Sequence, residues 1–495
     1  MSTFKYYAGA FSLWFLISQL LKWSRSYAKR RRIISQNGCE PPKSIIQKDP
    51  VFGFDIFNDQ VLQGWEKNSR NKYFANLFNI YGSTFQARMF HKRLIYTNSP
   101  ENIQAIHTTD FESFGVSPVR AFPLRPIVGR GIISSDGLQW KGLRAAVCQR
   151  FAPVQAAQIA NIENHVDKLL SRIPQDGIDL DLQILFQDLA LNTTMEFLFG
   201  ASLDMESPNS NKEFLEAFHY AQNLVPNRIL LPPHDIFTTD PKFWSSCRFV
   251  HQFVDKQILK TKSKPADSQT HSYSLVDSLL NRTEDVVEIR WHVLNWFLAA
   301  HEGIAVPLTN IFFYLARHPR VWALLKAELQ KFGSRKVSPK DARGLKYLEN
   351  VINEAFRLSP NLGTNERVAL RDTILPTGGG VLGKKPVFVR EGDLIVPSLY
   401  TLQRRTDIWG HDAEEFRPER WEEKRESPWT TLPFGGGPRM CPGKEIGLAQ
   451  VAYTVARICQ TFATCVNRDE TMEYVDDFRV VSVSRNGAKV AITSV

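Results

Sequence analysis

The chain is poor in cysteine, and its cysteines are not arranged in pairs. Six cysteines are scattered over 495 residues, and no two of them form a C-x-x-C pair. This spacing argues against a disulfide framework and against a structural zinc site, because both need clustered cysteines. We therefore expect reduced cysteines and a reducing compartment.

The sequence also lacks internal repeats and, after residue 50, any shift in composition that would mark a second domain. Hydrophobic residues make up 43% of the chain and aromatic residues 12%, which excludes a largely disordered protein. Helical spacing of apolar residues dominates from about 100 to 360, and strand-like segments occur near 84–97 and 362–400. We predict one domain over residues 51–495, mainly α with a small β part.

Acidic residues are absent from the N-terminal segment in which basic residues gather. Residues 22–32 hold six lysines and arginines, a local part of the net charge of +10. Residues 6–21, directly before them, are apolar but slightly short for a spanning helix. A signal peptide would carry its charge first and a cleavage site after, whereas here the order is reversed.

The positive-inside rule places this basic flank, and everything after it, on the cytosolic side. We predict a single N-terminal membrane anchor over residues 1–22, a basic and proline-containing hinge over 23–50, and a cytosolic catalytic domain. A helix that lies in the membrane interface is the alternative. No nucleic-acid partner is expected, because membrane topology accounts for the excess charge.

The segment from Phe434 to Gly443 places one cysteine in a glycine-rich loop just ahead of an apolar helix. Pro442 suits the first turn of a helix, so we expect Cys441 at the helix N-terminus, where the helix dipole favours a thiolate. The glycines let the backbone approach a large flat object, and Arg439 can reach a carboxylate on it. A haem fits, because its iron takes an axial thiolate and its propionates need cations.

The pattern F-x-x-G-x-R-x-C-x-G resembles the haem-binding loop of the cytochrome P-450 superfamily. The resemblance runs from about residue 38 to the C-terminus and is strongest to fungal membrane-bound alkane and fatty-acid hydroxylases. It implies the cytochrome P-450 fold, a helical domain around a buried haem b with a small β-sheet region. It further implies Cys441 as the axial thiolate, Phe434 and Arg439 in the haem loop, NADPH-cytochrome P-450 reductase as electron donor, and the endoplasmic reticulum membrane as location.

Two further sets of residues match the family. Trp140 and Arg144 stand four apart, so a helix would present both as donors to one carboxylate; in the family this pair binds a haem propionate, and Arg367 and Arg439 match two more propionate-binding arginines. A second set matches a buried structural network that holds the thiolate loop in place. Its members are Glu354, Arg357 and Arg420.

The oxygen-activating helix departs from the family pattern A/G-G-x-D/E-T-T. Glu302 keeps the acid, but Gly303 replaces the threonine whose hydroxyl helps deliver protons for O–O cleavage, and Ile304 follows. Loss of this threonine hydroxyl should slow proton delivery or uncouple the catalytic cycle. Pro307 removes the hydrogen bond to the Gly303 carbonyl, which could then hold a water in place of the hydroxyl. A simple kink without a catalytic role is the alternative, and we expect His301 on a helix face rather than on the iron.

Three classes of function remain open from the sequence. We predict a haem-thiolate monooxygenase that hydroxylates an apolar lipid, terpenoid or polyketide in fungal secondary metabolism. The alternative is a haem-thiolate isomerase, lyase or cyclase that inserts no oxygen and needs no proton relay. A non-enzymatic haem sensor or carrier is disfavoured, because it would need neither Glu302 nor a membrane anchor. Dependence on reductase and NADPH separates the first class from the others.

Overall fold

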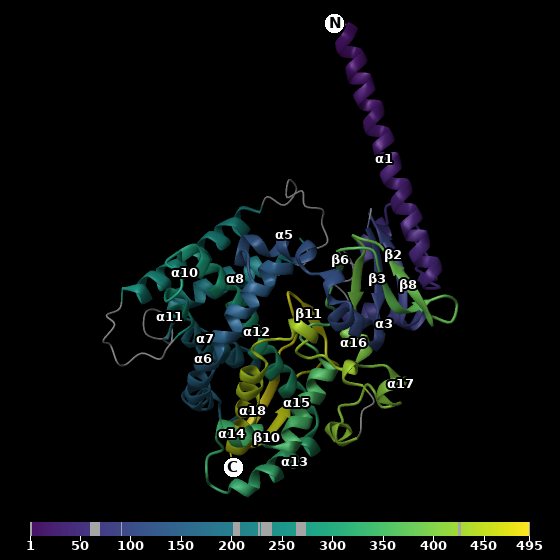
Figure 1. The fold of residues 1–495 in the computed structure, drawn as a ribbon. Coiled ribbons are helices and arrows are strands. Elements are labelled where there is room, and N and C mark those ends of the chain that lie inside the picture. The colour runs from purple at the N-terminus through teal and green to yellow at the C-terminus, as the bar shows by residue number, and fades with distance from the viewer. Residues whose placement is uncertain are drawn as a thin grey trace.

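The computed structural model of the chain describes residues 2–59, 70–90, 92–200, 208–225, 228, 240–263, 274–423 and 427–494. Helices dominate it, as predicted, and small sheets lie to one side (Figure 1). The principal helices are α1 (Ser2–Gln36), α3 (Arg70–Tyr81), α5 (Ser117–Val128), α6 (Gly137–Arg172), α7 (Leu182–Phe199), α8 (Pro208–Asn223), α10 (Pro241–Lys262), α11 (Leu275–Leu280), α12 (Val286–Arg317), α13 (Pro319–Leu329), α14 (Pro339–Arg343), α15 (Lys346–Leu358) and α18 (Lys444–Thr461).

The largest sheet has six strands in the order β1-β2-β3-β9-β6-β4. Its antiparallel pair β2–β3 lies where the alternating pattern near 84–97 predicted strands, and Phe85 and Tyr96 face each other across it. The strands of this sheet are β1 (Lys43–Ser44), β2 (Thr84–Met89), β3 (Lys92–Thr97), β4 (Phe114–Gly115), β6 (Arg367–Ala369) and β9 (Leu394–Pro397).

Three smaller sheets complete the β part. Two are antiparallel hairpins, β7–β8 and β11–β12, and one has the strand order β10-β13-β5. Their strands are β5 (Asp176–Asp181), β7 (Thr373–Gly379), β8 (Lys385–Val389), β10 (Phe462–Asn467), β11 (Asp476–Phe478), β12 (Ser482–Ser484) and β13 (Lys489–Ser494).

Helix α12 forms the centre of the helical part. It is apolar around most of its circumference, which is typical of a helix buried on all sides, and it packs against α7, α10, α15 and α18. Asp285 caps its N-terminus by accepting hydrogen bonds from the N–H groups of Val287 and Glu288. Pro307 lies inside the helix, which continues to Arg317. This long, capped and buried helix is the rigid element on which the predicted oxygen site is built.

Helix α1 stands away from the rest of the molecule, and only its C-terminal end approaches the sheets (Figure 1). There Arg30 pairs with Asp372 at 3.0 Å. The segment after α1 is held by the β7–β8 hairpin, because the Glu40 N–H donates to the Pro386 carbonyl at 3.0 Å. Within the described residues, no helix is both long and apolar enough to cross a membrane. Most side chains of the predicted anchor, residues 1–22, are not among those that the structure describes. The anchor therefore stays a prediction.

All six cysteines are free, as the sequence predicted. Helix α18 begins at Lys444 with Gly443 as its N-cap, two residues after the start near Pro442 that the sequence predicted. Cys441 lies in the loop just ahead of this helix, as predicted.

Candidate functional site

The loop that carries Cys441 is closed by its own backbone. The Cys441 N–H donates to the Phe434 carbonyl at 2.8 Å, and the Phe434 ring meets Phe356 of α15 edge to face at 5.4 Å. Gly437 has a φ of +63°, and a Cβ there would collide with the carbonyl oxygen of His107. Only glycine allows this approach, so the loop is fixed between α15 and the segment that holds His107.

The Cys441 thiol lies in a largely buried environment that does not by itself ionise it. Burial raises the pKa of the thiol, while the Gly443 N–H and the charge of Arg144 lower it by less. A thiolate at this position therefore needs a further positive charge, which a metal ion would supply.

Helix α12 passes close to this loop and leaves one face accessible. A Cβ on Gly443 would lie 3.9 Å from the Cys441 Sγ and 4.0 Å from the Trp296 ring. One turn later, Ala299 is exposed and Gly303 is half-buried, although nearly all their neighbours on the helix are buried. A Cβ on Gly303 would have no atom within 4 Å. The small residues of α12 thus border open space on the side that carries Trp296.

Four arginines gather beside the loop, from four different elements. Electrostatic interactions link Arg439 to both Arg120 and Arg144, and Arg367 to both Arg120 and Arg439. Burial, and then the charges of Arg120 and Arg439, lower the pKa of Arg367 to about 9. Such a concentration of like charge is unfavourable unless anions balance it.

Two carboxylates of the chain balance part of this charge. Asp136 pairs with Arg439 at 2.5 Å and also accepts hydrogen bonds from the N–H groups of Val116 and Ser117. Glu366 raises the pKa of Arg367 electrostatically, but it also pairs with Arg70 at 3.2 Å. The arginines therefore keep an excess of positive charge, which suits the two propionates of a haem.

The predicted propionate-binding residues lie together. Trp140 and Arg144 are both on α6, and the Arg439 guanidinium lies 4.4 Å from the centroid of the Trp140 ring. The Nε of Arg439 is buried, and no described residue accepts a hydrogen bond from it. An unsatisfied buried donor of this kind is expected where a ligand is to be bound. Together with Cys441 and the accessible face of α12, these residues fit a haem.

The predicted structural network is present and closed. Glu354 accepts hydrogen bonds from Arg357 at 2.9 Å and from Arg420 at 2.8 Å, and all three side chains are buried. Arg357 also donates to the carbonyls of Gln403 and Ala413. We call the group of Glu354, Arg357 and Arg420 the closed network. It ties α15 to the segment that leads into the Cys441 loop.

A second buried polar group lies between α12 and α8, next to Gly303 in the sequence. The Gln222 side-chain amide of α8 donates to Glu302 at 2.6 Å, and the two side chains are 1% and 5% exposed. Arg479, in the turn between β11 and β12, interacts electrostatically with Glu302 and with His219. Burial raises the pKa of Glu302 to about 7, while Gln222 and Arg479 lower it by less. We call Gln222, Glu302 and Arg479 the open cluster.

His301 points away from the accessible face of α12. It lies two residues before Gly303, about 200° around the helix, and its ring stacks on Phe297 at 5.4 Å. Burial lowers its pKa to about 3, so it is a neutral, fully buried side chain. This position agrees with a helix-face residue rather than an iron ligand.

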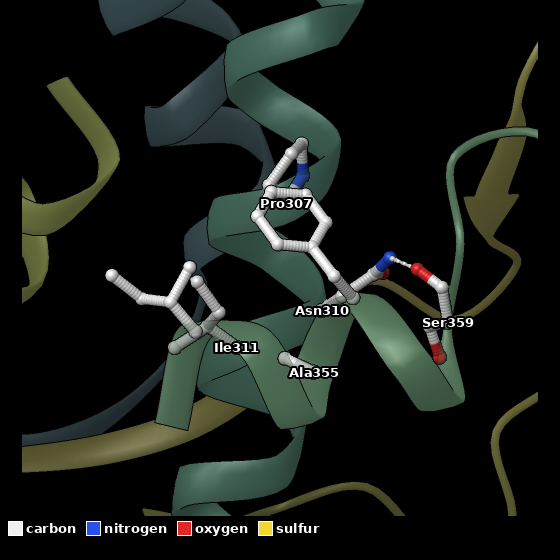
Figure 2. Close-up of a pocket in the computed structure, with 7 residues that line it drawn as sticks. Pro307, Asn310, Ile311, Ala355 and Ser359 are labelled. Atoms are coloured by element: carbon white, nitrogen blue, oxygen red, sulfur yellow. Dashed lines mark hydrogen bonds between the residues drawn. The ribbon is translucent and has the colours of Figure 1, made fainter. Parts of the chain in front are cut away.

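Pro307 faces a narrow gap between α12 and α15 (Figure 2). The empty space in this gap amounts to about 140 Å³, but it is too narrow to admit a water molecule. Asn310 closes one end by donating to the Ser359 carbonyl at 3.3 Å (Figure 2). Any water that the freed Gly303 carbonyl holds must therefore lie on the open Gly303 face rather than in this gap.

Three residues of the site were missed from the sequence. Arg120 is one of several charges in the segment before Trp140, beside Arg125, Arg130 and Asp136, so the sequence did not single it out. Arg479 is a lone charge in the apolar turn Phe478–Val481, which was the only available signal for it. Gln222 gave none, because its contact with Glu302 joins residues 80 positions apart.

Comparison with known proteins supports the resemblance. Residues 56–491 match the family model described as Cytochrome P450. The chain is 35% identical to Cytochrome P450 monooxygenase himC of Aspergillus japonicus, over 96% of this chain and 88% of the relative. It is 36% identical to Cytochrome P450 52E1 of Candida apicola, over 75% and 76%. It is 31% identical to Cytochrome P450 monooxygenase iccC of Talaromyces variabilis, over 94% and 95%.

Proposed function

The chain belongs to the cytochrome P450 family, an oxidoreductase family of monooxygenases, and we propose that it hydroxylates an apolar lipid, terpenoid or polyketide in fungal secondary metabolism. The observation that carries this proposal is the position of Cys441, in a closed loop close to the accessible face of α12. The relatives from filamentous fungi that bear the name monooxygenase support the reaction type.

Cys441 would hold the haem iron through its thiolate. Trp140, Arg144, Arg367 and Arg439 would hold the propionates. A haem bound there, supplied with two electrons, activates dioxygen for attack on unactivated carbon. We assign the electrons to NADPH-cytochrome P-450 reductase, and the location to the endoplasmic reticulum membrane with a cytosolic catalytic domain.

Glu302 would supply protons next to Gly303, at the accessible face of α12. Its pKa of about 7 lies near the working pH, where a carboxyl group both gives and takes a proton efficiently. Gly303 leaves open space next to it, and Pro307 leaves the Gly303 carbonyl without its helical donor. We assign to a water on this carbonyl the part of the proton path that a threonine hydroxyl provides elsewhere in the family.

The proposal is tested by labelling with ¹⁸O₂. The intact protein is expressed with a fungal reductase in a host that carries lipid, terpenoid and polyketide precursors, beside Cys441→Ala and the control Cys39→Ala. We expect an ¹⁸O-containing product with the unmodified protein and with Cys39→Ala, and none with Cys441→Ala. A Cys441-dependent product without label would contradict oxygen insertion and establish the isomerase, lyase or cyclase alternative.

A further inference from the structure

The open cluster contains polar atoms that no described residue satisfies. The Gln222 Oε1 is buried and accepts no hydrogen bond in the described part of the chain, although the side chain is only 1% exposed. The neighbouring His219 has an Nε2 in the same condition. A buried polar atom without a hydrogen bond is unfavourable, and native structures retain few such atoms. The cluster therefore has hydrogen-bonding capacity left for a ligand.

The orientation of Gln222 determines what this ligand must offer. Its amide N–H is engaged by Glu302 at 2.6 Å, so its oxygen is the atom left free. That oxygen can only accept, and the ligand must therefore donate a hydrogen bond.

Arg479 adds the opposite requirement. Its Nε makes a long hydrogen bond of 3.4 Å to Asp477, and its two NH₂ groups make none to the described residues. The turn is held in place because the Ser482 N–H donates to the Asn361 carbonyl at 2.8 Å, and Val480 packs against the apolar cluster of α8, α10 and α12. The Arg479 guanidinium interacts electrostatically with both Glu302 and His219. A ligand at this point must also accept.

The charges around Arg479 disfavour an anion. Asp477 pairs with its guanidinium at 3.4 Å, and Glu302 interacts with it electrostatically, so the cluster carries no clear excess of positive charge. A free carboxylate would also present only acceptors to the Gln222 oxygen. A neutral group that donates and accepts at once satisfies both sides.

We propose that the open cluster anchors a neutral hydroxyl or amide group of the substrate, with Gln222 accepting from it and Arg479 donating to it. Glu302 directly precedes Gly303 on α12, so the anchor lies beside the accessible face, and the apolar remainder of the substrate extends over that face. This assignment rests on the proposed monooxygenase function and narrows its substrate to apolar molecules that carry such a group.

The test uses three probes of equal length: 1-dodecanol donates and accepts, 1-methoxyundecane only accepts, and tridecane does neither. Binding to the reductase-free holoenzyme is followed by the substrate-induced change in the haem absorption spectrum. One net hydrogen bond corresponds to a change of roughly three- to tenfold in dissociation constant. We expect the alcohol to bind roughly three- to tenfold more tightly than the ether, and the ether roughly three- to tenfold more tightly than the alkane.

Two substitutions test separately the two preferences in this ranking. Gln222→Met should remove the preference for alcohol over ether, and Arg479→Met should remove the preference for ether over alkane. Asn223→Leu, on the exposed side of the same helix, should leave both preferences unchanged. Dodecanoate at pH 8 should bind no better than the ether.

The outcomes are distinguishable. Equal binding of all three probes, a ranking that survives both substitutions, or tighter binding of dodecanoate through Arg479 would each overturn the anchor. A protein without the carbon monoxide spectrum of a haem-thiolate would instead contradict the proposed function itself. A normal spectrum with no ranking of the probes removes only the anchor.

Discussion

The closed network and the open cluster are both buried and both contain a glutamate and an arginine, but they differ in how fully they are satisfied. Glu354 of the closed network accepts hydrogen bonds from two guanidinium groups, a backbone N–H and the Trp421 indole. In the open cluster, Glu302 accepts one hydrogen bond from the described residues, donated by Gln222, and the Gln222 oxygen has no partner among them.

This difference decides how each glutamate titrates. Burial raises the pKa of both. In the closed network the hydrogen bonds and charges of Arg357, Arg420 and the Arg417 N–H together outweigh burial, and the pKa of Glu354 falls below its ordinary value. In the open cluster the effect of burial is larger than those of Gln222 and Arg479, and the pKa of Glu302 rises to about 7. A fully satisfied charge serves the structure, whereas a partly satisfied one remains available to a proton or a ligand.

The largest effect is expected from opening the closed network. Glu354→Ala leaves two buried guanidinium groups without their carboxylate, and removal of one partner of a buried ion pair costs about 3–5 kcal/mol. We expect a loss of unfolding free energy of this size, together with poor retention of haem, measured by denaturation and by haem content. Glu349→Ala, on the exposed side of the same helix, is the matched control and should cost less than about 1 kcal/mol. Equal losses in the two variants would show that the network contributes no special stability.

The next effect comes from neutralising Glu302. Its pKa in the folded protein, about 7, lies above the ordinary value of 4.5, so its ionisation destabilises the fold as the pH rises between these values. Glu302→Gln removes this penalty, and its stabilising effect should grow by about 2 kcal/mol between pH 5.5 and pH 8. Thermal or chemical unfolding at the two pH values measures it. Glu349→Gln should show no such trend, and a flat response of Glu302→Gln would mean that the carboxyl group is solvated.

The same contrast separates what the sequence could predict from what it could not. The closed network was predicted because Glu354 and Arg357 stand one helical turn apart, and because Arg420 lies in a recognisable segment before Cys441. Local spacing and a motif were sufficient there. The mainly helical fold and the strands near 84–97 followed in the same way from the period of the apolar residues.

The open cluster could not be predicted, because packing alone brings its members together. Gln222, Glu302 and Arg479 come from three elements widely separated in the sequence, and their spacing carries no signal. Arg120 joined the arginine cluster for the same reason. The two-residue difference at the start of α18 is local: the turn at Pro442 and Gly443 continues the loop before the helix begins at Lys444. Proline allows a helix start but does not require one.

A smaller effect is expected from Pro307, which follows Gly303 by four residues on α12. Pro307→Ala restores a donor to the Gly303 carbonyl, which then no longer holds a water. We expect a several-fold rise in the hydrogen peroxide released per NADPH consumed, measured with the precursor of the labelled product as substrate. Pro319→Ala, at the first turn of α13, is the control and should leave the ratio unchanged. An unchanged ratio of peroxide to NADPH in Pro307→Ala would mean that the proline only kinks the helix and has no catalytic role.

The smallest change in stability is expected at Gly303, where the open space can be filled. A Cβ at this position meets no atom within 4 Å, so Gly303→Thr should fold normally and gain up to about 0.5 kcal/mol from helix propensity. The added hydroxyl should lower peroxide release, because it returns a proton-carrying group beside Glu302. Gly142→Thr adds the same side chain at another open helical glycine, in α6, and should gain similar stability without altering the peroxide ratio. Higher peroxide release in Gly303→Thr would mean that the water already present delivers protons better than the hydroxyl, and that the glycine is itself part of the site.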